Sequence, residues 1–356
     1  MTAPTTNLGH VLVTGGAGFI GCALSQVLAD RADSWVVVDN LHPQVHPGGQ
    51  RPNALHAAAR LIVADVTDPS TFEALEQTPT TVIHLAAETG TGQSLHQASR
   101  HGLVNVVGTT RLTDWLSTRD SRPTHVLLTS SRAVYGEGAW RGSDGQLRYP
   151  GQRSHAMLES GEWDFSDSTA VPMRADLVAP APTSVYGATK LAQEHVLAAW
   201  CQSEAVPLSV FRLQNVYGPG QSLTNPYTGI VTLFSRLAKA KEQIPVYEDG
   251  QIIRDFVFID DIVSALAAGL QHPADTVRTL DVGSGAASSI LELARLLSEL
   301  HGAPEPRITG QFRDGDVRHA LADITRTTAE LGYRPGHDLR AGVLALQDWM
   351  DEEASR

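Results

Sequence analysis

A glycine-rich segment near the N-terminus constrains the fold more than any other feature of the sequence. A strand predicted over His10–Thr14 runs directly into TGGAGFIG, and this segment opens a helix predicted over Gly18–Asp30. In such a turn Gly15 permits the tight bend, Gly18 lets a pyrophosphate approach the backbone, and Gly21 allows the helix to lie close to the strand. The free N–H groups of the helix N-terminus favour phosphate binding. The segment therefore predicts a strand–turn–helix unit that binds a dinucleotide.

The first half of the chain alternates short β-branched runs with longer amphipathic stretches. This alternation predicts right-handed crossovers and a parallel sheet covered by helices on both faces. We expect an α/β fold, with a Rossmann-type doubly wound parallel sheet and a smaller C-terminal α/β lobe. The other predicted strands are Trp35–Val38, Leu61–Ala64, Thr81–Leu85, His125–Thr129, Leu208–Arg212 and Leu280–Val282, and the other predicted helices are Leu103–Ser117 and Leu339–Asp351.

Two stretches interrupt this alternation. The segment Gln44–Arg51 is rich in Pro, Gly and His and predicts a surface loop. The longer segment 137–182 is rich in Gly, Ser, Asp and Pro, and a loop of that length is usually functional or else poorly ordered. Its aromatic residues would form a lid or pack locally. We expect a dinucleotide-binding domain over 1–215 that includes this insertion, and a smaller lobe over 216–356, with some crossing of the chain between them.

Composition excludes several classes of function. The formal net charge is −12, from 27 Lys and Arg against 39 Asp and Glu, which argues against binding to nucleic acid or to a membrane surface. We find no apolar run of about 18 residues and no signal peptide. The two cysteines, Cys22 and Cys201, fit buried thiols in a reducing, cytoplasmic setting. The 14 histidines show no spacing typical of metal ligands, and His84 fits a packed core histidine, so we expect no metal.

The end of the second predicted strand indicates which dinucleotide binds. Asp39 stands there, and a carboxylate at this position accepts hydrogen bonds from ribose hydroxyls and repels a 2′-phosphate, which favours NAD over NADP. Residues after the third and fourth strands would border the adenine and leave room for the cofactor, but they fit ordinary strand ends equally well. The candidate cofactor-binding residues in these segments are Gly15, Gly18, Phe19, Ile20, Gly21, Asp39, Asn40, Asp65, Val66, Leu85, Ala86 and Ala87.

Three polar residues form a candidate catalytic set. Tyr186 and Lys190 are four residues apart, so they share one face if this segment is helical. A phenol with a pKa near about 10 is a poor base at neutral pH, but a nearby ammonium and a positively charged nicotinamide favour the phenolate. The lysine would also hold the nicotinamide ribose. Ser131, at the end of the fifth strand, would hydrogen-bond the same substrate hydroxyl.

Seven motifs appear in a characteristic order: TGGAGFIG, VVVDN, HLAAETGTG, SSRAVYGEG, SVYGATK, FRLQNVYGPG and RDFVFIDD. From about residue 10 to 335 the chain resembles the extended short-chain dehydrogenase/reductase superfamily and, within it, the nucleotide-sugar epimerases and dehydratases. The resemblance implies tightly bound NAD on an N-terminal Rossmann domain and a nucleotide-diphosphate sugar in the C-terminal lobe. It also implies a homodimer formed by helices at about 94–117 and 186–202.

The resemblance assigns roles to individual residues. It supports Ser131, Tyr186 and Lys190 as the catalytic residues, with Tyr186 and Lys190 also contacting the cofactor, and it places Asn105 near the cofactor. On the substrate side it implies Glu88, Thr89, Gly90, Thr91 and Ser130 near the sugar, Asn215, Arg254 and Arg313 at the diphosphate, and Asp316 at the nucleotide. Planar guanidinium groups suit phosphate oxygens.

Three of the arginines also fit simpler structural roles. Arg132 either touches the substrate or is an exposed strand-end residue. Arg254 would otherwise pair with Asp255, and Arg313 would otherwise form a salt bridge with Asp314 or Asp316.

The residues after Ser131 bear on the reaction. Dehydratases carry an Asp-Glu pair there as an additional acid and base, whereas this chain has Arg132 and Ala133. The resemblance therefore implies epimerisation at C4 by transient oxidation and return of hydride, with a dTDP-hexose of the L-rhamnose type or a UDP-hexose as substrate. A reductase of nucleotide-linked 4-keto sugars is the alternative enzyme, and an NAD-binding sensor or scaffold is the alternative without catalysis.

Overall fold

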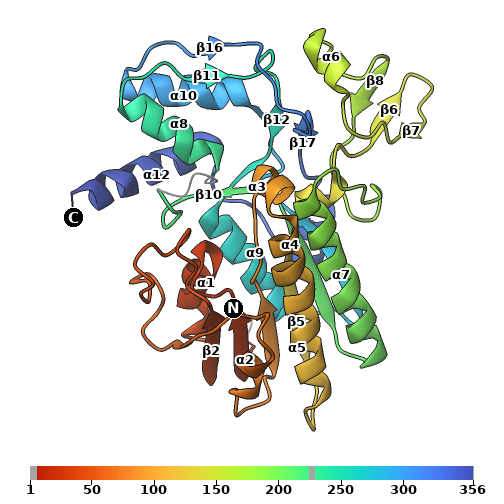
Figure 1. The fold of residues 1–356 in the computed structure, drawn as a ribbon, viewed down its shortest axis with the longest axis vertical. Coiled ribbons are helices and arrows are strands. Elements are labelled where there is room, and N and C mark those ends of the chain that lie inside the picture. Colours follow the sequence, from red (N-terminus) through yellow and green to blue (C-terminus); the bar gives the residue numbers. More distant parts are fainter. Residues whose placement is uncertain (1–5, 224–228, 356) are drawn as a thin grey trace.

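A seven-stranded parallel sheet forms the centre of the computed structural model, which describes residues 6–223 and 229–355 (Figure 1). The strand order is β14-β9-β5-β4-β1-β2-β3. The strands are β1 (His10–Thr14), β2 (Ser34–Asp39), β3 (Arg60–Val63), β4 (Thr81–His84), β5 (His125–Ser131), β9 (Leu208–Leu213) and β14 (Val277–Val282). The predicted Rossmann-type sheet is confirmed, and each predicted strand lies within a few residues of an observed one.

The central strands are apolar on both faces because helices cover both sides of the sheet. One face packs Val13, Ile83 and Leu127 against α1 (Phe19–Leu28), α9 (Ile259–Gln271) and α11 (Thr325–Leu331). The other face packs Leu12 and Val82 against α2 (Pro69–Glu73), α5 (Gly108–Ser117) and α7 (Val185–Ser203). Strands β1 to β3 follow one another towards one edge of the sheet, and β4 to β14 follow one another towards the other edge. Ligands of such sheets bind where this order reverses, between β1 and β4, beyond the carboxyl ends of the strands.

The segment before α5 departs from the single helix predicted over Leu103–Ser117. Two short helices, α3 (Thr91–His96) and α4 (Ala98–His101), precede a π-helical turn, η1 (Gly102–Val107), which runs directly into α5. A π turn inserts an extra residue into a helical turn, a feature frequent at functional sites. Helix periodicity in the sequence does not distinguish a π turn from an α turn.

The smaller lobe has its own core, formed by apolar residues of its three helices and of several short strands. The helices are α8 (Ile230–Lys239), α10 (Ile290–His301) and α12 (Leu339–Ala354). The strands are β10 (Asn215–Tyr217), β11 (Pro245–Val246), β12 (Ile253–Arg254), β13 (Phe256–Phe258), β15 (Ser288–Ser289), β16 (Arg307–Ile308) and β17 (His319–Ala320). Between these elements the chain returns once to the large sheet as β14.

The insertion at 137–182 has secondary structure of its own. It forms an antiparallel sheet from β6 (Trp140–Gly142), β7 (Leu147–Arg148) and β8 (Ser168–Ala170), together with α6 (His155–Glu159). It lies beside the smaller lobe (Figure 1), where Met173 and Val178 share a buried cluster with Val317 and Ala320. The segment therefore packs as an ordered unit against the lobe that follows it in the sequence.

Two further predictions concern the helices and the cysteine thiols of the described residues. Of these helices, none combines the length and the apolar composition that crossing a bilayer requires. Cys22 and Cys201 are free and buried, as predicted, and burial raises the pKa of each thiol to about 12. Gln44–Arg51 contains neither helix nor strand, as expected of a loop.

Candidate active site

A cleft of about 350 Å³ lies at the carboxyl ends of the strands, where the strand order reverses. It is lined by all twelve candidate cofactor residues from the strand ends and the first turn: Gly15, Gly18, Phe19, Ile20, Gly21, Asp39, Asn40, Asp65, Val66, Leu85, Ala86 and Ala87. The predicted surface loop also contributes lining residues, Val45 and His46 among them. Nothing in the sequence indicates this contribution, because loop residues carry no periodicity that relates them to a strand end.

The packing of the first turn explains its glycines. Gly15 has a φ of +68°, and a Cβ there would lie 2.6 Å from the Ala86 amide nitrogen. A Cβ on Gly21 would lie 2.5 Å from the Gly16 Cα, so these backbones approach more closely than any side chain allows. The N-terminus of α1 has no side-chain cap and no acidic residue in its first turn. Its N–H groups therefore remain available to an anion, which fits the pyrophosphate of a dinucleotide.

Asp39 shapes the floor of this cleft. Its Oδ2 accepts a hydrogen bond from the Ala17 N–H at 3.0 Å, and its Oδ1 accepts one from the Leu41 N–H at 2.9 Å. Beside it, Asn40 donates to Asp65 Oδ2 at 2.9 Å. Each carboxylate oxygen of Asp39 has a second lone pair, so the residue can still accept a hydrogen bond from a ribose hydroxyl.

A close approach of α7 to β5 brings two of the predicted catalytic residues together. Ser184 caps the helix by accepting a hydrogen bond from the Gly187 N–H at 3.0 Å. A Cβ on Gly187 would lie 2.3 Å from the Ala133 carbonyl oxygen, so only glycine permits this contact. The result is a hydrogen bond between the side chains of Ser131 and Tyr186. Burial raises the pKa of Tyr186, while this hydrogen bond and the positive charge of Arg132 act to lower it.

Lys190 lies one turn further along α7, and its side chain is buried. Its Nζ donates to the Thr129 carbonyl oxygen at 2.8 Å and to Gln193 Oε1. Burial lowers the pKa of Lys190 to about 7, opposed by Glu194. The guanidinium of Arg132 is a cation that acts on Tyr186 and was not predicted from the sequence, and the role of Lys190 beside the phenol stays a prediction.

Asn105 braces the site from the π turn and is fully buried. Its Oδ1 accepts from the Glu88 N–H at 2.7 Å, and its Nδ2 donates to the Glu88 carbonyl at 3.0 Å and to Thr189 Oγ1 at 2.9 Å. It thereby links the loop after β4 to α7, between Tyr186 and Lys190.

The predicted sugar-facing residues take different positions. Glu88 and Thr89 line the cleft, and the Glu88 carboxylate pairs with Arg100. Gly90 has a φ of +104° and Thr91 begins α3, so the loop turns sharply there. Ser130, by contrast, is 5% exposed and donates to the buried carboxylate of Glu194. Its hydroxyl is thus directed towards Glu194 in the core, and its contact with the sugar stays a prediction.

Four of the predicted substrate-binding residues contact one another in two pairs. Arg132 is half-buried, not an exposed strand-end residue, and its Nε donates to Asn215 Oδ1 at 2.9 Å. Arg254 Nη2 lies 2.6 Å from Asp316 Oδ1, so its ionic partner is Asp316.

The structural alternatives for Arg254 and Arg313 are therefore not observed. The Asp255 carboxylate accepts backbone N–H groups of Ser284, Gly285 and Ala322 instead of pairing with Arg254. Arg313 is exposed and lies over the Tyr247 ring, 5.1 Å from its centroid.

The fold, the glycine-lined cleft and the Ser131–Tyr186 contact define a dinucleotide-dependent enzyme of the extended short-chain dehydrogenase/reductase class. The chain belongs to the NAD dependent epimerase/dehydratase family, whose model matches residues 11–283.

Known proteins support this assignment over the whole chain. A dTDP-L-rhamnose 4-epimerase of Burkholderia thailandensis is 59% identical over 348 residues, covering 97% of this chain and 96% of that protein. The crystal structure of a UDP-glucose 4-epimerase with UDP-glucose, from Thermotoga maritima, has a TM-score of 0.79 at 25% identity and covers 97% of this chain and 99% of its own. MoeE5 in complex with UDP-glucuronic acid and NAD has a TM-score of 0.75 at 28% identity, with coverage of 97% and 100%.

Proposed function

We propose that this protein is an NAD-dependent 4-epimerase of a dTDP-linked 6-deoxyhexose, interconverting dTDP-L-rhamnose and its C4 epimer. The observation that carries the proposal is the 59% identity over 97% of the chain to a dTDP-L-rhamnose 4-epimerase. NAD would lie within residues 1–215 and the sugar nucleotide against 216–356. We further propose a cytoplasmic homodimer.

The residues support this chemistry as follows. The cleft residues from β1 to β4 would hold NAD, which supplies a hydride acceptor and donor when it is bound. Tyr186 would take the proton of the C4 hydroxyl, and Ser131, hydrogen-bonded to it, would orient that hydroxyl. Arg132 would favour the phenolate through its charge.

The segment after Ser131 separates epimerisation from elimination. Arg132 and Ala133 occupy the two positions there, and neither side chain is a carboxylic acid. Proton transfer at C5 or C6 needs an additional acid and base. Without that pair, the ketone at C4 would be reduced again by hydride on either face. Reduction on the face opposite to the original one gives the C4 epimer.

Purified protein incubated with dTDP-L-rhamnose should produce a second set of anomeric proton signals in the NMR spectrum, without added cofactor and without net formation of NADH. No deuterium from D₂O should enter any sugar carbon. Stoichiometric consumption of a reduced cofactor would establish the 4-keto-sugar reductase instead. UDP- and GDP-hexoses in parallel incubations would show the nucleotide preference.

The Tyr186→Phe variant tests the assigned proton acceptor. Removal of the hydroxyl should lower kcat by about 10²-fold or more while bound NAD stays unchanged. Tyr149→Phe is the matched control, because Tyr149 is 43% exposed on the insertion and lies outside the cleft. Full activity in Tyr186→Phe would indicate a different base.

A further inference from the structure

The insertion at 137–182 places one arginine in the interior of the smaller lobe. Arg153, which precedes α6, is 1% exposed. Its Nη1 and Nη2 each lie 2.8 Å from one oxygen of Glu248, whose side chain is also 1% exposed. Glu248 itself has a φ of +52°. Residues other than glycine rarely adopt this backbone conformation, so the surrounding contacts must stabilise it. The two side chains form a bidentate ion pair closed off from solvent.

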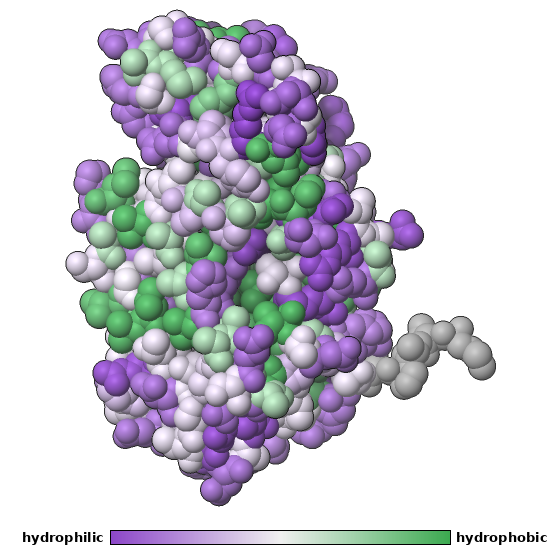
Figure 2. Space-filling model, turned by 90° about the vertical axis from the view of Figure 1, so that its right-hand side faces the viewer, coloured by the Kyte–Doolittle hydropathy of each residue, from purple (hydrophilic) through white to green (hydrophobic). Residues whose placement is uncertain are grey.

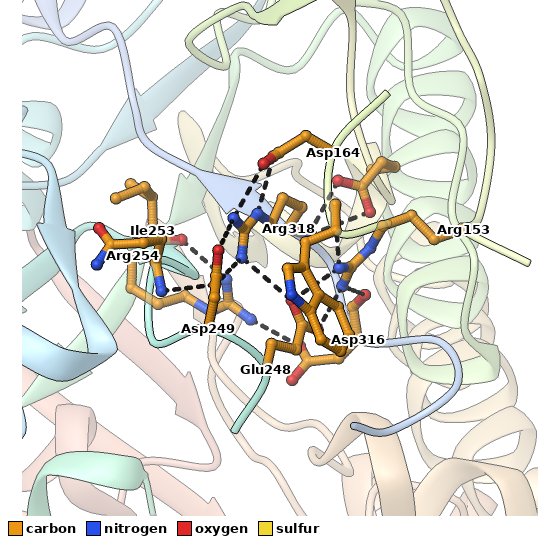
Figure 3. A network of polar contacts seen from close by, with 11 residues as sticks. Arg153, Asp164, Glu248, Asp249, Ile253, Arg254, Asp316 and Arg318 are labelled. Carbon is orange, nitrogen blue, oxygen red and sulfur yellow. Dashed lines mark hydrogen bonds and ion pairs between the residues drawn. The ribbon is translucent and has the colours of Figure 1, made fainter. Parts of the chain in front are cut away.

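A second buried arginine, Arg318, contacts the insertion at two points, and its ion pair with Asp164 is drawn in Figure 3. Arg318, 4% exposed, pairs through two nitrogens with Asp164 at 2.9 and 3.0 Å and with Asp249 at 2.7 and 2.9 Å. Its backbone N–H donates to the Glu137 carboxylate, at 2.9 Å to the nearer oxygen. The insertion is therefore anchored near its start and in its middle.

Asp316 lies between these anchors and the candidate phosphate site. Arg153 Nη2 donates to the Asp316 carbonyl oxygen at 2.9 Å, and the Asp316 carboxylate holds Arg254 Nη2 at 2.6 Å (Figure 3). One arginine thus binds the backbone of Asp316 while the other binds its side chain. A displacement of Arg153 would therefore move Asp316, whose carboxylate orients the Arg254 guanidinium.

This arrangement differs from that of a lid. Lids are drawn from segments of low local stability, with exposed backbone and few buried contacts. Here the contacts to the lobe are buried, bidentate and charged, and breaking one partner leaves an uncompensated charge in the interior. The insertion is thus held against the lobe by contacts within the protein itself.

We propose that the insertion is a fixed wall of the substrate site and that Arg153 is a positioning residue, which sets Asp316 and through it Arg254 for the diphosphate of the substrate. The inference rests on the proposed function for the identity of that substrate. Arg153 touches neither substrate nor cofactor; its effect passes through the Asp316 backbone.

The test uses a double variant, Arg153→Met with Glu248→Gln, in the full-length protein. It removes the charge that a single substitution would leave unpaired and keeps an acceptor for Arg318, so the fold should survive. We expect the Kd for dTDP, measured by calorimetry, and the KM for dTDP-L-rhamnose to rise about tenfold, with kcat within about threefold and bound NAD unchanged. Arg148→Met is the control, since Arg148 forms an exposed ion pair with Asp144 on the same insertion.

The outcomes separate this inference from the proposed function. A folded double variant with wild-type Kd and KM would overturn the positioning role. Equal losses in kcat, KM and NAD content would indicate a general structural role and would overturn it as well. Weakened dTDP binding in a protein whose wild type epimerises no sugar nucleotide would support the inference and refute the function. If the double variant does not fold, Arg153→Lys decides, because a lysine keeps the positive charge but its single nitrogen cannot form the two-nitrogen pair with Glu248 that fixes the guanidinium.

Discussion

Several titratable side chains beneath the cleft take their ionisation state from burial. Lys190 bonds to Gln193, whose Nε2 lies 3.1 Å from His84 Nε2. His84 is fully buried, with Nδ1 2.6 Å from Thr14 Oγ1, and its pKa is lowered to about 3, first by burial and then by the charge of Lys190. The predicted core histidine is confirmed, although its partners are hydroxyl and amide groups. A neutral imidazole here supports the lysine without adding a second positive charge.

This depressed pKa gives stability a pH dependence. Above the unfolded value of 6.5 His84 is neutral in both states, and below it the unfolded chain takes up a proton that the folded chain refuses. Stability should fall as the pH drops from about 6.5 to 5, by up to about 1.4 kcal/mol per pH unit from this group. Urea unfolding of wild type and His84→Gln at both pH values measures it. The prediction fails if both proteins lose stability at the same rate.

Helix α7 shows how one element brings together residues distant in sequence. Its N-terminus meets the turn after β5 through Gly187, and Glu194 on the same helix binds Arg212 of β9 at 2.6 and 3.0 Å. Both contacts are buried, so the rotation and height of the helix are set at two places. The Ser131–Tyr186 hydrogen bond depends on this placement.

Gly187→Ala tests that dependence. Alanine raises helix propensity by about 1 kcal/mol, but its Cβ would overlap the Ala133 carbonyl, and overpacking typically costs about 1–3 kcal/mol. We expect no gain in thermal stability and a marked loss of kcat, as Tyr186 moves from Ser131. Gly102→Ala is the control because a Cβ there meets nothing within 4 Å, and it should be neutral or stabilising. A more stable, fully active Gly187→Ala would contradict the close approach.

At the scale of the whole molecule, buried ion pairs and exposed apolar side chains have separate roles. The ion pairs of Arg153 and Arg318 join the insertion to the smaller lobe. Apolar side chains form patches among polar ones on the face that carries α7 (Figure 2). Leu95 of α3 and Leu103 of η1 are 60% and 53% exposed. Burial of such side chains against a second copy is favourable and supports the proposed homodimer.

Leu103→Asp should therefore shift the protein towards monomer in sedimentation velocity, since it places a charge in the proposed interface. Leu344→Asp on α12 is the control, as Leu344 is 42% exposed but lies on the smaller lobe. A wild type that sediments as a monomer at micromolar concentration would refute the proposed dimer.

The sequence by itself determined the features that rest on neighbouring residues. The strands, the glycine turn after β1 and the spacing of Tyr186 and Lys190 follow from local periodicity and backbone sterics, and the structure contains all of them. The motif order also indicated the family, which the comparison confirms over residues 11–283.

Only the tertiary structure decided which polar groups meet. Glu248 and Asp316 lie 95 and 163 positions from Arg153, which joins them, and no spacing rule relates the three. The same holds for Ser130, turned towards Glu194, and for Arg132, whose charge acts on Tyr186. Charged side chains find partners by distance in the folded chain, and periodicity reports only which way a side chain faces along its own element.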